Sequence, residues 1–386
     1  MSRVRLMSAW IILLSLLVIC RPTEAEEFNI KAKAAVLMDP ESGRVLFAQN
    51  ERQRLPPASV TKVMTMLLIM EAVDSGRVKW DDKIPTSATA AGIGGSQVYL
   101  KEGETFTLHE MFKAIAVVSA NDASTAVAEY LYGSGEDFIA AMNKRAQQLG
   151  LKNTHFANET GLPDPNHYSS AYDLAVISRE LLKHHKILEY TSIRKDSLRD
   201  GRFVLYNTND LIKVYPGADG LKTGHTAEAK FCLAATAKRD NLRLLSVILG
   251  AASNAERVAQ TRRLLDYGFR TYERRVVRRK NATVGEIGFA EAQPAKVAVK
   301  VGADFTVLSE RANAKPVITR LVKAENLRLP LAAGAKVGFL KAYQGETKLG
   351  QTPVYTTQPV KKANFLVLGW RALVNFIKNL LGMKVR

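Results

Sequence analysis

A serine and a lysine three residues apart, Ser59 and Lys62, are the side chains of this sequence best placed for covalent catalysis. They lie in the stretch PPASVTK (residues 56–62), and the apolar run 63–70 that follows predicts a buried helix. Residues three apart share one face of a helix, so we expect the Lys62 amine to lie against the Ser59 hydroxyl. A lysine whose pKa is lowered by burial or by a nearby cation can accept the proton of a serine hydroxyl. The stretch therefore predicts Ser59 as a nucleophile and Lys62 as its base.

The spacing alone does not identify a site, because Ser192 to Lys195 repeats it without an apolar helix behind it. Two other motifs favour Ser59. Ser119-Ala120-Asn121 stands between two predicted helices, 108–118 and 122–132, where serine and asparagine also occur simply as helix caps. Together with the other motifs, Ser119 is interpreted as a proton relay, and Asn121 as an amide that hydrogen-bonds a substrate carbonyl.

The third motif, Lys222-Thr223-Gly224-His225, alternates as the edge of a strand would. Gly224 would let the backbone of this strand approach a ligand closely. In the loop predicted over 158–170, we expect Glu159 to be a surface residue.

Both ends of the chain have the pattern of targeting segments. Arg3 and Arg5 precede an apolar run and the small-residue site Thr23-Glu24-Ala25, which predicts a secretory signal peptide over residues 1–25. Removal of this peptide would take Cys20 with it and leave Cys232 as the one remaining cysteine. We expect Cys232 to be a buried packing residue. Residues 361–386 predict an amphipathic helix lying in a membrane interface; docking on the neighbouring domain is the alternative.

Between these ends the sequence predicts two domains. In residues 26–271, strands at 32–38, 44–48, 231–237 and 243–250 enclose a helical block, which predicts an α+β fold with one antiparallel sheet covered by helices. We expect its last helix over 254–267, ending at Gly268. Residues 272–360 alternate polar and apolar side chains between glycines and prolines, which predicts a small all-β domain.

The net charge of +18 is concentrated in the C-terminal third. Residues 271–386 contain 21 lysines and arginines against 7 acidic residues, whereas residues 26–270 contain 31 against 29. For an exported protein, this pattern favours an anionic membrane or cell-wall surface and argues against nucleic acid as a partner. The six histidines form no H-E-x-x-H pair and the cysteines are unpaired, so the sequence predicts no metal site.

In this order, the S-x-x-K motif at Ser59, the S-x-N motif at Ser119 and the K-T-G motif at Lys222 resemble those of the penicillin-recognising serine enzymes. From residue 34 onward, the chain resembles the low-molecular-mass penicillin-binding proteins of the D-alanyl-D-alanine carboxypeptidase type. The resemblance implies the β-lactamase/penicillin-binding-protein fold, a β-rich second domain and an amphipathic C-terminal anchor. It also implies removal of the terminal D-Ala from peptidoglycan stem peptides through an acyl-enzyme on Ser59, with no metal or organic cofactor.

The resemblance further implies roles for the strand motif. Backbone N–H groups of Ser59 and His225 would form an oxyanion hole, and Lys222 and Thr223 would hold the terminal carboxylate of the substrate. Lys222 would also help to lower the pKa of Lys62. β-Lactams would act as slowly released inhibitors, and the protein would reside in the periplasm or on the outer face of the cytoplasmic membrane.

Three other functions remain open at this point: a D,D-endopeptidase, a β-lactamase and a non-enzymatic cell-wall scaffold. The sequence lacks a glutamate in the context typical of class A β-lactamases, which argues against the second. Intact nucleophile, base and strand motifs argue against the third.

Overall fold

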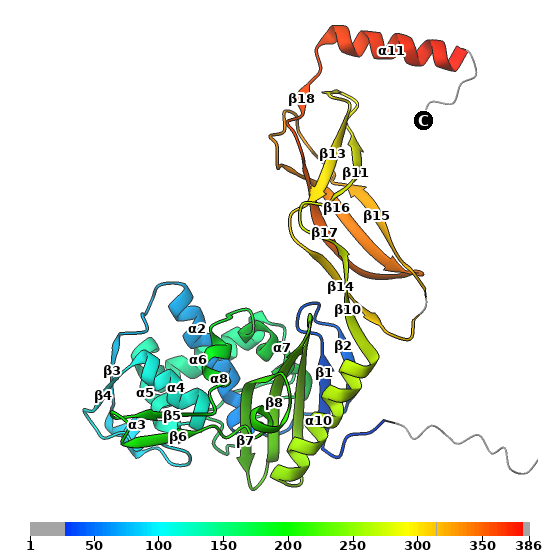
Figure 1. Ribbon diagram of the computed structural model, residues 1–386. Helices are drawn as coiled ribbons and strands as arrows, with labels where there is room; N and C mark the ends of the chain where they lie inside the picture. The colour runs from blue at the N-terminus through cyan, green and yellow to red at the C-terminus, as the bar shows by residue number, and fades with distance from the viewer. Residues whose placement is uncertain (1–27, 314, 381–386) are drawn as a thin grey trace, which may run out of the picture.

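The computed structural model describes residues 28–313 and 315–380, so the predicted signal peptide lies outside the described residues. Two bodies follow one another along the chain: an N-terminal domain of sheet and helices, and an elongated β domain that stands away from it (Figure 1). A final helix lies at the end of the β domain that is remote from the N-terminal domain.

The centre of the N-terminal domain is an antiparallel sheet of five strands in the order β2-β1-β9-β8-β7. As predicted, its strands come from both ends of the domain: β1 (Ala34–Met38), β2 (Val45–Gln49), β7 (Ala218–Thr226), β8 (Lys230–Arg239) and β9 (Leu242–Ala251). Successive side chains of a strand face opposite sides of the sheet. Val36 therefore enters the core below the helical block, and Leu37 enters a second core on the other face.

The segment between β2 and β7 forms the helical block. It contains the short 3₁₀ helix η1 (Ala58–Thr61) and the helices α2 (Lys62–Asp74), α3 (Ala88–Gly92), α4 (Leu108–Val118), α5 (Asn121–Tyr132), α6 (Gly135–Gln148), α7 (Ala171–Leu181), α8 (Ile187–Thr191) and α9 (Leu211–Val214). Two small two-stranded antiparallel sheets complete it: β3 (Lys83–Pro85) with β4 (Thr105–Thr107), and β5 (Lys195–Leu198) with β6 (Phe203–Tyr206).

The opposite face of the sheet is covered by α10 (Asn254–Thr271). The prediction that this helix ends at Gly268 was wrong, because α10 continues for three more residues. A Cβ at Gly268 would lie 2.7 Å from a methyl of Leu37 and 2.6 Å from one of Leu244. The glycine is therefore a contact point between helix and sheet, not a helix end.

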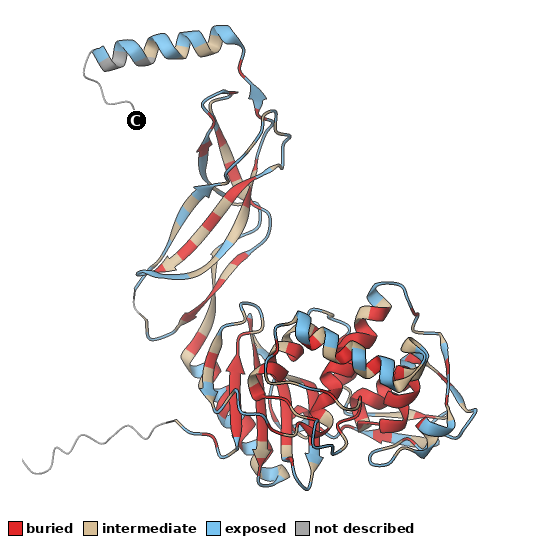
Figure 2. Ribbon diagram, turned by 180° about the vertical axis from the view of Figure 1, so that it is seen from behind, coloured by how far each residue is buried: buried red, intermediate tan, exposed pale blue. Residues whose placement is uncertain are grey.

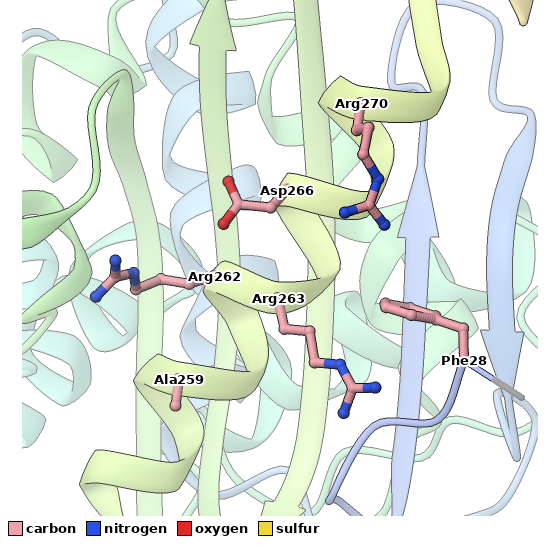
Figure 3. A pocket seen from close by; sticks show the side chains of 6 residues that line it. All are labelled: Phe28, Ala259, Arg262, Arg263, Asp266 and Arg270. Atoms are coloured by element: carbon pink, nitrogen blue, oxygen red, sulfur yellow. The ribbon is translucent and has the colours of Figure 1, made fainter. Parts of the chain in front are cut away.

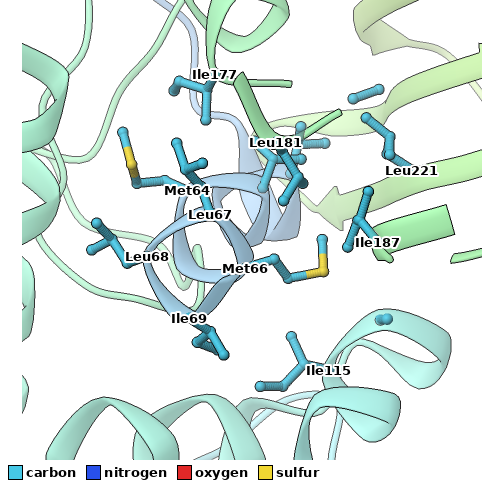
Figure 4. Packing of buried hydrophobic residues seen from close by; sticks show 14 of the residues in the cluster. Met64, Met66, Leu67, Leu68, Ile69, Ile115, Ile177, Leu181, Ile187 and Leu221 are labelled. Atoms are coloured by element: carbon cyan, nitrogen blue, oxygen red, sulfur yellow. The ribbon is translucent and has the colours of Figure 1, made fainter. Parts of the chain in front are cut away.

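Helix α2 runs through the middle of the helical block, and every residue from 62 to 70 is buried. Figure 4 shows its apolar side chains meeting those of three neighbouring helices, with Ile69 facing Ile115 of α4, Met66 near Ile187 of α8, and Leu181 of α7 on a third side. Complete burial of one such side chain contributes roughly 1.5–3 kcal/mol. Packing on all sides therefore fixes the position of the helix N-terminus, where Lys62 stands.

The all-β domain predicted after residue 271 is present. Its main sheet has the order β11-β13-β17-β16-β15, formed by β11 (Thr283–Gly288), β13 (Lys296–Val301), β15 (Val317–Lys323), β16 (Lys336–Gln344) and β17 (Thr347–Thr356). Two further pairs join β10 (Tyr272–Arg278) to β14 (Phe305–Glu310), and β12 (Ala292–Gln293) to β18 (Lys361–Lys362). Since β18 belongs to this domain, the domain extends beyond the predicted limit at residue 360.

The two domains meet where β10 leaves α10. Arg274 of β10 forms ion pairs with Asp39 and with Glu41, both in the turn between β1 and β2. The side chain of Arg274 is 5% exposed and that of Asp39 is fully buried, so this contact is shielded from solvent. A second ion pair, Arg44 with Glu310, is exposed.

The final helix, α11 (Phe365–Leu380), lies within the predicted segment 361–386. Most of its described residues are exposed, in contrast to the buried core of the N-terminal domain (Figure 2). Arg371 ties it to the β domain by donating hydrogen bonds to the carbonyls of Ala290 and Ala292. Among the described residues, none of the helices has the length and hydropathy needed to cross a membrane.

Candidate active site

Ser59 lies in η1, one turn before α2 begins at Lys62. The prediction that Ser59 belongs to the first turn of the α-helix was therefore wrong, but the expected contact is present: the Lys62 amine lies 3.1 Å from the Ser59 hydroxyl oxygen. Residues i and i+3 eclipse one another in a 3₁₀ turn, which keeps the two side chains face to face. Ala58, just before the serine, has a φ of 47°, a conformation that is strained for an alanine and that surrounding packing must maintain.

The Lys62 amine has three fixed neighbours. Besides Ser59, the Nζ atom lies 2.7 Å from the side-chain oxygen of Asn121 and 2.7 Å from the backbone carbonyl of Thr160. Burial lowers the pKa of Lys62 to about 7, while the carboxylates of Glu159 and Asp122 act in the opposite direction. A neutral amine has two N–H donors and one lone pair. Asn121 and Thr160 take the two donors, which leaves the lone pair for the Ser59 hydroxyl.

Ser119 and Asn121 lie at the corner between α4 and α5, as predicted. Ser119 caps α4 in the left-handed conformation, with a φ of 67°. Its side chain is buried, and its hydroxyl has no hydrogen-bond partner among the described residues. Asn121 donates from its amide nitrogen to the carbonyl of Gly94, 2.6 Å away, which places the loop after α3 beside the site. Ser119 is thus a buried hydroxyl whose hydrogen-bonding capacity is unused by the described residues.

The strand motif lies on β7, the edge strand next to η1. A Cβ at Gly224 would stand 2.8 Å from the carbonyl oxygen of Pro57 and 3.0 Å from the backbone nitrogen of Val60. Only a residue without a side chain permits this approach of β7 to η1. The side chain of the next residue, His225, faces the other side of the sheet. Its ring is exposed and packs on Phe231, which adjoins the core on the α10 face, with 4.2 Å between ring centroids.

Lys222 and Thr223 precede this contact and are both buried. The Lys222 amine donates a 2.9 Å hydrogen bond to the backbone carbonyl of Thr223. The hydroxyl oxygen of Thr223 lies 2.7 Å from that of Thr208. Burial lowers the pKa of Lys222 well below its ordinary value, and the positive charges of Lys62 and Arg257 lower it further. Burial is the main cause of the lowered pKa of Lys62, and a further contribution from Lys222 stays a prediction.

The expectation that Glu159 lies at the surface was wrong. Glu159 is 5% exposed, and its carboxylate accepts a hydrogen bond from the hydroxyl of Thr125 on α5. Asp122, which the sequence analysis did not single out, is fully buried and accepts backbone N–H groups of Val98 and Leu100. Neither carboxylate belongs to a periodic pattern, so no signal in the sequence distinguishes them from surface acids.

Other candidates do not assemble into a reaction centre. Ser192 and Lys195 are exposed, and the Lys195 amine lies over the ring of Tyr206. Cys232 is buried, as predicted, and burial raises its pKa to about 11. Within residues 28–313 and 315–380, no group of three or more His, Cys, Asp or Glu side chains is arranged to hold a metal ion.

A separate cavity of about 500 Å³ lies on the outer face of α10, across the sheet from Ser59. Figure 3 shows its polar lining, in which arginines predominate: Phe28, Ala259, Arg262, Arg263, Asp266 and Arg270. This lining contains no hydroxyl, thiol or amine that could act as a nucleophile. The position of the reactive groups, and not cavity size, therefore locates the candidate active site.

Comparisons with known proteins agree with this geometry. Residues 21–253 match the family described as D-alanyl-D-alanine carboxypeptidase, and residues 272–362 match the C-terminal domain of penicillin-binding protein 5. The chain is 42% identical over 356 residues to D-alanyl-D-alanine carboxypeptidase DacF of Bacillus subtilis, covering 91% of this chain and 92% of that relative.

Solved structures give the same result. Penicillin binding protein 5 from Haemophilus influenzae has a TM-score of 0.75 and 30% identity, over 87% of this chain and 99% of that one. Penicillin-binding protein D2 from Listeria monocytogenes, in its ampicillin-bound form, has a TM-score of 0.58 and 33% identity, over 63% of this chain and 99% of that one.

The chain belongs to the D-alanyl-D-alanine carboxypeptidase family of penicillin-binding proteins. It is a serine-type hydrolase of the cell wall, with the predicted α+β fold and separate all-β domain confirmed. Neither the endopeptidase, the β-lactamase nor the scaffold alternative is favoured by these relatives.

Proposed function

We propose that Ser59 attacks the carbonyl of the penultimate D-Ala of a pentapeptide stem while Lys62 accepts the hydroxyl proton. The carbonyl carbon gains a bond to the Ser59 oxygen, the terminal D-Ala leaves with a proton, and water then hydrolyses the ester. The observation that carries this proposal is the setting of the Lys62 amine. It is buried, its pKa is lowered to about 7, and its bonds on two sides direct the lone pair of the neutral form to Ser59.

Further roles belong to the same proposal. Ser119, whose hydroxyl has no hydrogen-bond partner within the described part of the chain, relays the proton toward the leaving amine. Asn121 positions Lys62 and presents its amide to the substrate. Backbone N–H groups of Ser59 and His225 stabilise the oxyanion; one such donor contributes about 3–4 kcal/mol in comparable enzymes.

The substrate carboxylate lies against Lys222 and Thr223 in this proposal. Burial and neighbouring cations disfavour the ammonium form of Lys222 in the free protein. An arriving carboxylate favours that form and so forms an ion pair with it. This requirement for a terminal carboxylate accounts for carboxypeptidase action on the last residue of the stem. No step of the proposed mechanism needs a metal or organic cofactor.

The test is intact-protein mass after incubation with benzylpenicillin, followed by release of D-Ala from a peptide ending in D-Ala-D-Ala. Each measurement is repeated with Ser59→Ala. A stable adduct on Ser59 and D-Ala release that depends on this serine are expected. An adduct without D-Ala release would favour an endopeptidase or a binding role, rapid turnover of the penicillin would favour a β-lactamase, and no adduct would refute the assignment of Ser59.

We further propose that the protein is exported and held at the outer face of the cytoplasmic membrane, or in the periplasm, by α11. The apolar side chains of α11 are exposed, not packed on the β domain: Phe365, Leu366, Trp370, Leu373, Phe376, Ile377 and Leu380. An exposed apolar stripe on a helix next to basic residues suits the interface of an anionic bilayer. Exposure of this stripe favours anchoring over the alternative of docking on the β domain.

Sedimentation with vesicles tests the anchor. The full chain is expected to bind vesicles that contain anionic phosphatidylglycerol, and a chain that ends at residue 364 is expected to stay in solution. Trp370→Ala and Leu373→Ala together should weaken binding severalfold. Equal binding by the shortened chain would show that α11 is not the anchor.

A further inference from the structure

The buried carboxylate of Glu159 is a group near the site that the proposed mechanism does not use. It lies in the loop between α6 and α7, and the Thr125 hydroxyl of α5 donates a hydrogen bond to it. An uncompensated buried carboxylate is costly, so a protein that retains one normally gives it charged or hydrogen-bonding partners. A single neutral hydroxyl is a modest partner, and the charge of this carboxylate also acts on a buried cation, Lys62.

The segment that carries Glu159 contacts both η1 and α2, the elements that hold Ser59 and Lys62. The backbone carbonyl of Glu159 accepts a 2.7 Å hydrogen bond from Thr65 of α2, and the next carbonyl, that of Thr160, accepts from the Lys62 amine. At Gly161, with a φ of 86°, a Cβ would stand 2.0 Å from the carbonyl oxygen of Ala58. The segment is therefore fixed between α2, α5 and η1, and any movement of Glu159 displaces an acceptor of Lys62.

Four charged or titratable groups face the Lys62 amine from the elements around it. Asp122 of α5 is already bonded to backbone N–H groups of the 98–100 loop. Lys222 of β7 opposes a positive charge on Lys62, and His167 is neutral at pH 7 because burial lowers its pKa to about 4. Among the described residues, the Thr125 hydroxyl is thus the one hydrogen-bond partner of the Glu159 carboxylate.

We propose that Glu159 is a positioning residue for Lys62: its carboxylate, held by Thr125, fixes the loop that presents the Thr160 carbonyl and supplies negative charge to the amine. This inference rests on the proposed assignment of Lys62 as the base. The loop contact controls where the amine lies, and the charge controls the pH at which the amine becomes neutral. Glu159 touches neither Ser59 nor the substrate in this role and is not itself a base.

The test is the pH dependence of the acylation rate with a fluorescent penicillin, for the full chain and for Glu159→Gln. Glutamine keeps the size of the side chain and can still accept from Thr125, but it removes the charge. The acidic limb of the profile is expected to move about one pH unit lower, since a neighbouring opposite charge shifts a pKa by roughly 1–3 units. At pH 5.5, the variant should then retain about eightfold more of its plateau rate than the unmodified protein does.

Thr125→Val is the matched variant, because it removes the hydrogen bond and keeps the charge. It is expected to lower the plateau rate severalfold, by loosening the loop, and to leave the midpoint of the profile where it is. A midpoint that does not move in Glu159→Gln would overturn the proposal, as would an equal shift in Thr125→Val.

A substitute variant and the pH profile of the unmodified protein complete the test. If Glu159→Gln does not fold, Glu159→Asp replaces it: the retained charge should keep the midpoint within about 0.3 pH units while the shorter side chain lowers the plateau. A larger shift in Glu159→Asp would contradict the proposal. If the unmodified protein shows no acid limb, or no adduct at Ser59, the assignment of Lys62 or of Ser59 is refuted instead.

Discussion

The buried ion pair between Asp39 and Arg274 joins the two domains, and removing its negative charge should destabilise the protein strongly. In Asp39→Asn, Arg274 remains 5% exposed, with Glu41 as its remaining acidic partner. Leaving one partner of a buried pair unpaired typically costs about 3–5 kcal/mol. Because Glu41 is 61% exposed and still contacts the guanidinium at 3.0 Å, we expect a value near the lower limit, about 3 kcal/mol.

Differential scanning calorimetry measures this effect. For a domain of this size, about 3 kcal/mol corresponds to a fall in Tm of roughly 6–12 °C. The double variant Asp39→Asn/Arg274→Met should recover most of the loss, because the unpaired charge is gone and, within the described residues, the Nε atom of Arg274 has no hydrogen-bond partner to lose. Acylation by penicillin at 25 °C should be unchanged, since Asp39 bonds to none of the groups that hold Ser59 or Lys62.

The control is Arg44→Ala, which breaks the exposed pair with Glu310. The side chains of Arg44 and Glu310 are 43% and 45% exposed. Exposed ion pairs contribute about 0–1 kcal/mol to the free energy of unfolding, so Tm should fall by less than about 3 °C. A fall in Asp39→Asn no larger than that of the control would refute the argument from burial. So would a double variant that is less stable than the single one.

Three further predictions concern the pH dependence of acylation, the contact of β7 with η1, and the burial of Cys232. Because the neutral Lys62 amine is the proposed base and its pKa is about 7, protonation should lower the acylation rate about tenfold for each pH unit below 6, with a plateau above pH 8, in stopped-flow fluorescence. Gly224→Val should reduce acylation by about 100-fold or more, because its side chain would meet the Pro57 carbonyl and push β7 away from Ser59; an active variant would contradict this packing. Cys232, fully buried and with its pKa raised to about 11, should react with a thiol reagent only after unfolding, and fast labelling of the native protein would contradict its burial.

Local patterns in the sequence predicted much of this protein correctly. The spacing of Ser59 and Lys62 predicts their contact because a helical turn, whether 3₁₀ or α, brings residues three apart together. Strand alternation and turn residues predicted the sheet, and the change of texture after residue 271 predicted the β domain. These features depend on residues close together in the sequence, so a single amino-acid sequence is enough to predict them.

The prediction of the end of α10 failed for an instructive reason. A glycine after a helical pattern usually marks a C-terminus. At Gly268 it instead permits close contact with Leu37 and Leu244, which lie far away in the sequence. Glycine occurs both at helix ends and at close contacts between elements, and the sequence alone does not distinguish the two.

By itself, the sequence determined which side chains could form the reaction centre and in which order their elements follow. The tertiary structure decided their setting: the burial that lowers the pKa of Lys62, the Thr160 carbonyl that accepts from it, and the burial of Glu159 beside it. The physical reason is that burial and charge proximity arise from segments about 60 to 100 residues apart in the chain, and no short-range periodicity encodes such contacts.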